Sequence, residues 1–228
     1  MESKGNSVEQ FYTKNGDAYV RQYRIDHSPR IQEMISRYDL KKGLAGKRLA
    51  DIGGGLGFAG ELLDESTEYW VIDGANIDPA IRVSKGNWFK ADLDYDKFSE
   101  SRDTVMGGLF DAAFCLEVIE HCSSVHNLLV EIKKIVKPNG DIFISIPTEQ
   151  VTHNAPYPSL LWPVQNFAQF LGQMALPIED FYVYKPVSCG WPAYQFKCRN
   201  AGWEEKKLLF PKDEAKFLPL NSVECTNI

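Results

Sequence analysis

The chain has 228 residues, of which 44% are hydrophobic and 25% charged, so its composition differs from that of disordered or collagen-like chains. No stretch approaches the roughly 18 to 20 consecutive apolar residues of a membrane helix, and residues 1–10 lack the apolar core of a signal peptide. The five cysteines include no C-x-x-C pair, which indicates free thiols rather than a disulfide framework or a structural zinc site. We expect a soluble, cytoplasmic protein without a membrane partner.

The net charge of -6 is concentrated in the middle of the chain. Residues 41–150 carry 12 basic and 18 acidic groups, whereas residues 1–40 and 151–228 each carry equal numbers of both. A protein that binds a nucleic-acid backbone normally has a basic surface, and no segment has a net positive charge. The charge distribution therefore disfavours a nucleic-acid partner.

In chain order, residues 1–40 are expected to form a helical lid before the first strand. Residues 41–150 alternate short apolar runs with helix-like stretches, which is typical of a doubly wound, mostly parallel α/β sheet. The expected strands are residues 48–52, 69–73, 88–92, 110–117 and 141–147, and the helical stretches are 58–64, 79–85 and 124–136. The last of these has leucine and isoleucine at spacings of three and four, which predicts an amphipathic helix.

The segment 151–196 has an unusual composition. Its residues 154–196 hold ten of the 28 aromatic residues and six of the 12 prolines, but only three charged groups. We expect such a segment to pack as a cap that shields one end of the sheet. A further interpretation, compatible with the first, is that this cap lines an apolar or sugar-stacking substrate pocket. In residues 197–228 we expect closing elements, namely a short helix over Phe196–Gly202 and a strand over Trp203–Phe210. The whole chain, 1–228, is then a single domain.

A glycine-rich turn follows the first predicted strand. Glycines allow backbone N–H groups to approach a ligand and a helix to pack closely on a strand. Gly55, Gly57 and Gly60 match the dinucleotide pattern G-x-G-x-x-G, and Asp78 lies about 20 residues further on, as a ribose ligand of NAD would. This pattern predicts a nicotinamide-dependent reductase.

The same turn matches a second pattern, D-x-G-x-G-x-G, through Asp51, Gly53, Gly55 and Gly57. An acid beside an anionic pyrophosphate is unfavourable, whereas a ligand with an ammonium and a sulfonium group gains from it. Asp73, at the end of the second strand, is then the expected acceptor for two ribose hydroxyls, with Asp78 as the alternative. This interpretation also agrees with the acidic excess of residues 41–150.

Over about residues 45–150 the sequence resembles the class I S-adenosylmethionine-dependent methyltransferases, and in particular the ubiquinone-biosynthesis O-methyltransferases. The matching elements, in order, are the turn Asp51–Gly57, Asp73, the tripeptide Ala91-Asp92-Leu93, the run Phe110–Phe114 before Glu117–His121, and the turn Val136–Asp141. The resemblance implies a seven-stranded sheet and S-adenosylmethionine as cofactor. By that resemblance Gly53, Gly55 and Gly57 contact its methionine part, Asp73 its ribose, and Asp92 with Leu93 its adenine.

The run Glu117 to His121 has two interpretations. If it is helical, Glu117, Glu120 and His121 share one face and form a site for magnesium or manganese, with His153 as a further ligand. This arrangement resembles the metal sites of ubiquinone-biosynthesis O-methyltransferases and small-RNA 2'-O-methyltransferases. In the alternative, the glutamate caps the following helix and the histidine faces the substrate without a metal.

The chemistry of the acceptor decides which catalytic groups are needed. An alcohol must lose its proton when it is methylated, and His121 is the best-placed base, with Glu117 as a second catalytic candidate. We therefore expect O-methylation of a small-molecule or glycan-like acceptor. The other functions considered are an RNA 2'-O-methyltransferase, an NAD-dependent reductase and a non-catalytic binding module. The sequence does not predict the oligomeric state.

Overall fold

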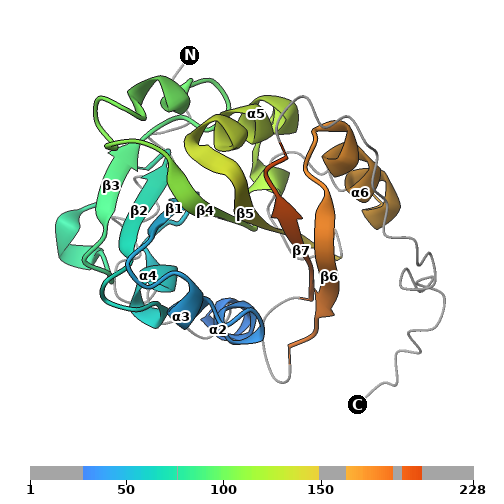
Figure 1. The fold of residues 1–228 in the computed structure, drawn as a ribbon, viewed down its shortest axis with the longest axis horizontal. Helices are drawn as coiled ribbons and strands as arrows, with labels where there is room; N and C mark the ends of the chain where they lie inside the picture. The colour runs from blue at the N-terminus through green and yellow to red at the C-terminus, as the bar shows by residue number, and fades with distance from the viewer. Residues whose placement is uncertain (1–27, 76, 149–162, 187–191, 202–228) are drawn as a thin grey trace.

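The computed structural model describes residues 28–75, 77–148, 163–186 and 192–201, which form one mixed β-sheet with helices on both faces (Figure 1). The strand order is β3-β2-β1-β4-β5-β7-β6. The predicted strand Trp203–Phe210, residue His153 and the first 27 residues of the predicted lid lie outside the described residues.

The bounds of the elements follow the predicted core closely. The strands are β1 (Arg48–Ile52), β2 (Glu68–Asp73), β3 (Asn87–Lys90), β4 (Phe110–Leu116), β5 (Val136–Pro147), β6 (Ile178–Tyr184) and β7 (Ala193–Arg199). The α-helices are α2 (Ser28–Arg37), α3 (Leu40–Gly43), α4 (Phe58–Leu62), α5 (Val125–Ile135) and α6 (Val164–Gln173). Within the described residues, three short 3-10 helices, η1 (Pro79–Ile81), η2 (Phe98–Ser101) and η3 (Ile119–His121), lie in the connections.

Strands β1 to β5 pair in parallel, and β7 pairs antiparallel with both β5 and β6. The strand order reverses at β1, which lies between β2 and β4. In sheets of this kind the loops diverge at the reversal and leave a crevice at the carboxyl ends of the strands, where ligands bind. A ligand site is therefore expected at the turns that follow β1 and β4.

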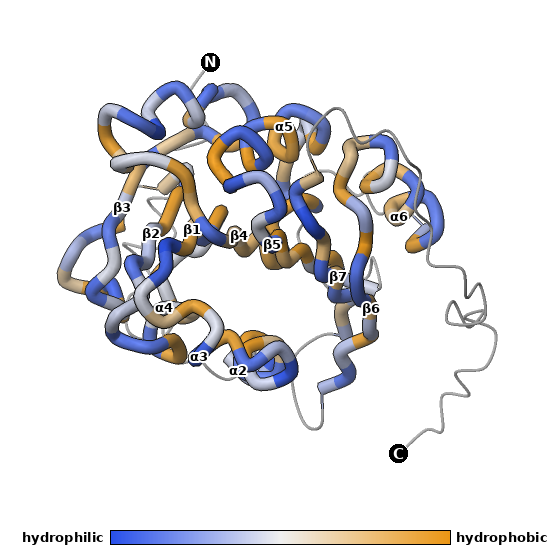
Figure 2. The backbone as a smooth tube through the Cα atoms, viewed as in Figure 1, coloured by the Kyte–Doolittle hydropathy of each residue, from blue (hydrophilic) through white to orange (hydrophobic). Residues whose placement is uncertain are grey.

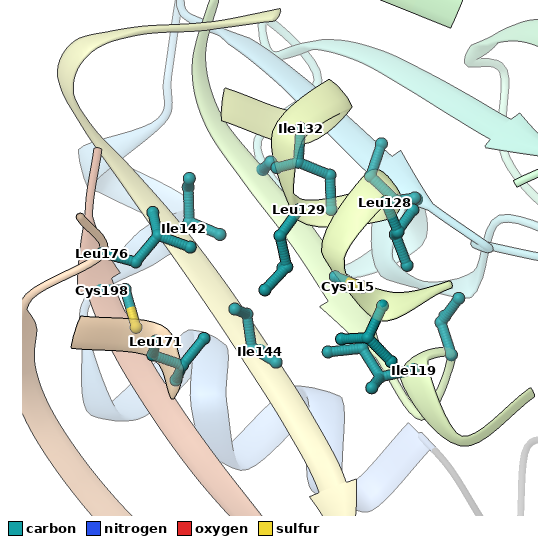
Figure 3. Packing of buried hydrophobic residues seen from close by; sticks show 14 of the residues in the cluster. Cys115, Ile119, Leu128, Leu129, Ile132, Ile142, Ile144, Leu171, Leu176 and Cys198 are labelled. Carbon is teal, nitrogen blue, oxygen red and sulfur yellow. The ribbon is translucent and has the colours of Figure 1, made fainter. Parts of the chain in front are cut away.

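Alternating side chains of the central strands supply two apolar layers. On one face, Leu129 and Ile132 of α5 and Leu171 of α6 pack with Ile142 and Ile144 of β5 (Figure 3). On the other face, apolar residues of α2 and α3 pack with β1, β2 and β4. Figure 2 shows the central strands β1, β4 and β5 as mainly hydrophobic, whereas the helices alternate between hydrophobic and hydrophilic residues.

The predicted helix over Phe196–Gly202 is wrong, because residues up to Arg199 belong to β7. Strand β7 is hydrogen-bonded on both sides, to β5 and to β6. This pairing between distant segments outweighs the local helical preference predicted for residues 196–202. The described part of the predicted cap is also regular: it forms α6, β6 and the start of β7. In the parts of the chain that are described, no helix is long and apolar enough to cross a membrane.

Candidate cofactor site

The glycine turn after β1 is closely packed from two sides. Gly53 has a φ of 67°, and a Cβ atom there would lie 2.5 Å from Cγ2 of Val118, which follows β4. Gly57 has a φ of 83°, and its Cβ would lie 2.6 Å from Oγ of Ser84. Both positions combine a left-handed backbone with a close neighbour, so glycine is required at each. The turn after β1 therefore directly contacts the turn after β4.

Asp73 connects the end of β2 to this glycine turn. Its Oδ2 accepts a hydrogen bond from the backbone N–H of Gly55 at 3.0 Å, and its Oδ1 accepts one from Ala75 N–H at 2.8 Å. A carboxylate has about four lone-pair sites, so two remain for a ligand. Asp78, the alternative ribose ligand, is exposed, and its side chain caps η1 by accepting from Ala80 N–H at 2.9 Å. The carboxylate at the glycine turn is thus that of Asp73.

Asp51 lies beneath the turn and is buried. The hydroxyl of Tyr69 donates a hydrogen bond to its carboxylate. Burial raises the pKa of Asp51 to about 7, although the Tyr69 hydrogen bond acts in the opposite direction. The sequence suggests a permanently ionised Asp51, whereas in the folded protein this carboxyl group is protonated in about half of the molecules near pH 7.

Asp92 and Leu93, the adenine contacts that the resemblance implies, follow β3, which ends at Lys90 and not at Asp92 as predicted. Asp92 is exposed and its Oδ1 accepts a hydrogen bond from Asp94 N–H at 3.0 Å, while Leu93 is half-buried against the core. Asp94, which the sequence analysis did not identify, accepts a hydrogen bond from Ser123 N–H at 2.5 Å. This bond connects the turn after β3 to the segment that precedes α5.

Glu117 follows β4 in a left-handed conformation, with a φ of 57°. For a residue other than glycine this costs about 1–2 kcal/mol. Its Oε1 accepts a hydrogen bond from the Ser145 hydroxyl at 2.8 Å, and its Oε2 lies 3.4 Å from Nη1 of Arg30. Arg30, Glu117 and Ser145 are all buried. No local pattern in the sequence indicates Arg30 or Ser145, because α2 and β5 bring them to Glu117 from distant parts of the chain.

The two other candidates of this run lie in η3. Glu120 is 1% exposed, and burial, followed by the nearby charge of Glu117, raises the pKa of its carboxyl well above the usual range. The imidazole of His121 is 41% exposed, and its Nε2 lies 4.0 Å from Glu120 Oε1. His121 is thus exposed to solvent, while its Nε2 lies near the buried carboxyl of Glu120.

The predicted magnesium or manganese site is not formed by the described residues, in which no group of three or more His, Cys, Asp or Glu side chains could hold a metal ion. The prediction required one helical face for Glu117, Glu120 and His121. Instead, the left-handed backbone at Glu117 precedes η3 and turns its carboxylate to Ser145 and Arg30. His153, the further predicted ligand, lies outside the described residues.

Comparison with known proteins identifies a family. The family described as "Methyltransferase domain" matches residues 21–176. Among curated proteins, the chain is similar to ubiquinone biosynthesis O-methyltransferases from Pseudomonas aeruginosa, at 30% identity over 77% of this chain and 72% of the relative. A relative with the same name from Dechloromonas aromatica is 34% identical over 120 residues, and the match spans about half the length of each protein.

Two solved structures have a similar fold. The magnesium protoporphyrin IX methyltransferase from Synechocystis PCC 6803, with bound S-adenosylhomocysteine, gives a TM-score of 0.62 at 14% identity over 85% of this chain and 98% of the other. The 1,6-didemethyltoxoflavin-N1-methyltransferase from Burkholderia thailandensis gives a TM-score of 0.60 at 13% identity over 89% and 92%. At these identities the likeness concerns the fold alone.

Proposed function

Because the chain belongs to the methyltransferase-domain family and is an S-adenosylmethionine-dependent methyltransferase, we propose that it methylates a hydroxyl oxygen of a small-molecule acceptor. The observation that carries this proposal is the position of His121, an exposed imidazole on the turn that packs against the glycine turn. The relatives' name, which specifies O-methylation, supports the same class of acceptor atom.

The described residues suit the cofactor. S-Adenosylmethionine supplies a methyl group on a positively charged sulfur, which is already activated for transfer. Asp73 has lone pairs left for the ribose hydroxyls, and Gly53 and Gly57 keep the turn free of side chains that would fill it. Asp51 offers a carboxylate that can ionise when a cationic group binds above it. Asp92 and Leu93 are the expected contacts for the adenine.

In this proposal His121 is the base that accepts the proton of the acceptor hydroxyl. A neutral imidazole is a base suited to neutral pH, and burial raises the pKa of the neighbouring Glu120 carboxyl well above its usual range. Glu117, a second catalytic candidate in the sequence, is engaged by Ser145 and Arg30, so we assign it to holding the turn rather than to contact with the acceptor. A glycan-like acceptor stays a prediction from the aromatic segment.

Transfer of a radiolabelled methyl group from S-adenosylmethionine tests the proposal. The acceptors are a panel of phenols and sugar alcohols, together with amine analogues of the same size. We expect a hydroxyl compound to be methylated, and a His121→Ala variant to lose at least tenfold in kcat with S-adenosylhomocysteine affinity unchanged. His126→Ala is the matched control, because His126 is exposed on α5. Preferred methylation of amines, or near-full turnover by His121→Ala, would contradict the proposal.

A further inference from the structure

We propose that Arg30 of α2 is a positioning residue, which holds the turn 117–121, and with it His121, against the glycine turn. This inference deepens the proposed function and rests on it for the purpose of His121. The residues that carry it lie on three separate elements: Arg30 on α2, Glu117 after β4, and Ser145 on β5. Apart from Glu117, none of these was expected at the site.

The backbone at Glu117 needs support from its surroundings. A left-handed conformation at a residue other than glycine persists only where the surrounding structure determines it. Ser145 supplies part of that restraint: its hydroxyl oxygen accepts a hydrogen bond from Glu117 N–H at 3.0 Å, and the same hydroxyl donates to Glu117 Oε1 at 2.8 Å. This leaves Oε2, the other carboxylate oxygen, to be held from elsewhere.

The buried charge of Glu117 is compensated by Arg30. Its side chain is 5% exposed and that of Arg30 is 4% exposed, with 3.4 Å between Oε2 and Nη1. When one member of such a buried pair is removed, the remaining charge is strongly disfavoured in the interior. Without Arg30, the Glu117 carboxylate lowers its free energy by moving toward water. That movement requires the strained backbone at Glu117 to change its conformation.

The backbone at Glu117 is connected to the glycine turn and to His121 through Val118. Val118 is the next residue, and its methyl groups fill the space where a side chain at Gly53 would lie. The N–H of His121 donates to Val118 O at 2.9 Å and closes the turn. A change at Glu117 therefore moves Val118 and, through the closed turn, His121. The ion pair of Arg30 thus acts on His121 through the backbone and not through contact with a substrate.

Hydrogen exchange followed by mass spectrometry measures the turn directly. In Arg30→Met we expect the peptide covering residues 117–122 to exchange at least fivefold faster, while exchange in the core strands and S-adenosylhomocysteine affinity stay within twofold of the wild type. Arg30→Lys retains the charge but not the planar fork, and we expect intermediate exchange. The matched control is Arg37→Met, because Arg37 lies on the same helix and pairs with Asp180 of β6 instead.

Activity supplies a second measurement once a methylated acceptor is known. Arg30→Met should lower kcat at least tenfold with KM for S-adenosylmethionine within twofold, and Arg30→Lys should recover part of the loss. In a Glu117→Gln background the Arg30→Met change should lower kcat by less than a further twofold, because both act through one contact.

The outcomes separate this inference from the proposed function. Unchanged exchange at residues 117–122 in Arg30→Met, or faster exchange throughout α2 and the sheet, would overturn the positioning role. Absence of methyl transfer by the wild-type protein to any hydroxyl acceptor would instead contradict the proposed function, and the exchange result would still decide the role of Arg30 in holding the turn.

Discussion

Asp51 allows a prediction whose size and sign follow from the structure. Burial raises the pKa of this carboxyl from its usual value near 4 to about 7 in the folded protein. Below about pH 4 the carboxyl is protonated in both the folded and the unfolded states, so it has no effect on stability. Between pH 4 and 7 only the unfolded state ionises, so stability falls as the pH rises. Above pH 7 the full penalty is present.

An Asp51→Asn variant removes this penalty. A shift of about three pKa units corresponds to about 4 kcal/mol, so the variant should gain nothing near pH 4 and up to about 4 kcal/mol in free energy of unfolding at pH 8. The asparagine oxygen can still accept the hydrogen bond from Tyr69. Urea unfolding of the ligand-free protein at several pH values between 4 and 8 measures the difference.

The same substitution should weaken binding of the cofactor. A positively charged ammonium group stabilises the ionised form of Asp51, so the loss in S-adenosylhomocysteine affinity should be larger at pH 8 than at pH 6. Stability and affinity therefore change in opposite directions in one variant. A difference in unfolding free energy between variant and wild type that does not depend on pH would show that the pKa of Asp51 is not raised in the folded protein.

Two further substitutions probe the glycine turn and the core. Gly57→Ala should abolish S-adenosylhomocysteine binding by calorimetry, because its Cβ would meet the Ser84 hydroxyl at 2.6 Å on a left-handed backbone; affinity within threefold of the wild type would contradict this. Lys133→Met should lower the free energy of unfolding, measured in urea, by about 3 kcal/mol. The buried ammonium donates to three backbone carbonyls, and unpaired buried carbonyls cost about 1–3 kcal/mol each. A loss below about 1 kcal/mol would contradict this role of the ammonium.

The sequence predicts the parallel core well because its signals are local. Strand β1 has the predicted bounds, Arg48–Ile52, since an apolar run ends at glycines. Helix α5 differs by one residue at each end from its prediction, because its leucine and isoleucine spacing has a clear period. Strands β6 and β7 are not predicted, since β7 pairs with β5 across more than 40 residues and β6 joins the sheet only through β7.

The candidate site divides in the same way. Spacing predicts Asp51, Asp73 and the glycines as a site, because the ends of two neighbouring strands and one turn set their positions. The buried network around Glu117 is not, since Arg30 reaches it only when α2 docks on the sheet. The shared helical face predicted for Glu117, Glu120 and His121 is wrong because Glu117 adopts a left-handed conformation, which no feature of the sequence indicates.

We propose that the glycine turn and Asp73 hold S-adenosylmethionine, and calorimetric titration with S-adenosylhomocysteine measures this binding. The wild-type protein should bind S-adenosylhomocysteine and not NADH. Asp73→Asn should lose at least tenfold in affinity, whereas Asp78→Asn, at the exposed cap of η1, should stay within twofold. Absence of binding heat with S-adenosylhomocysteine, or a larger loss in Asp78→Asn than in Asp73→Asn, would contradict the account.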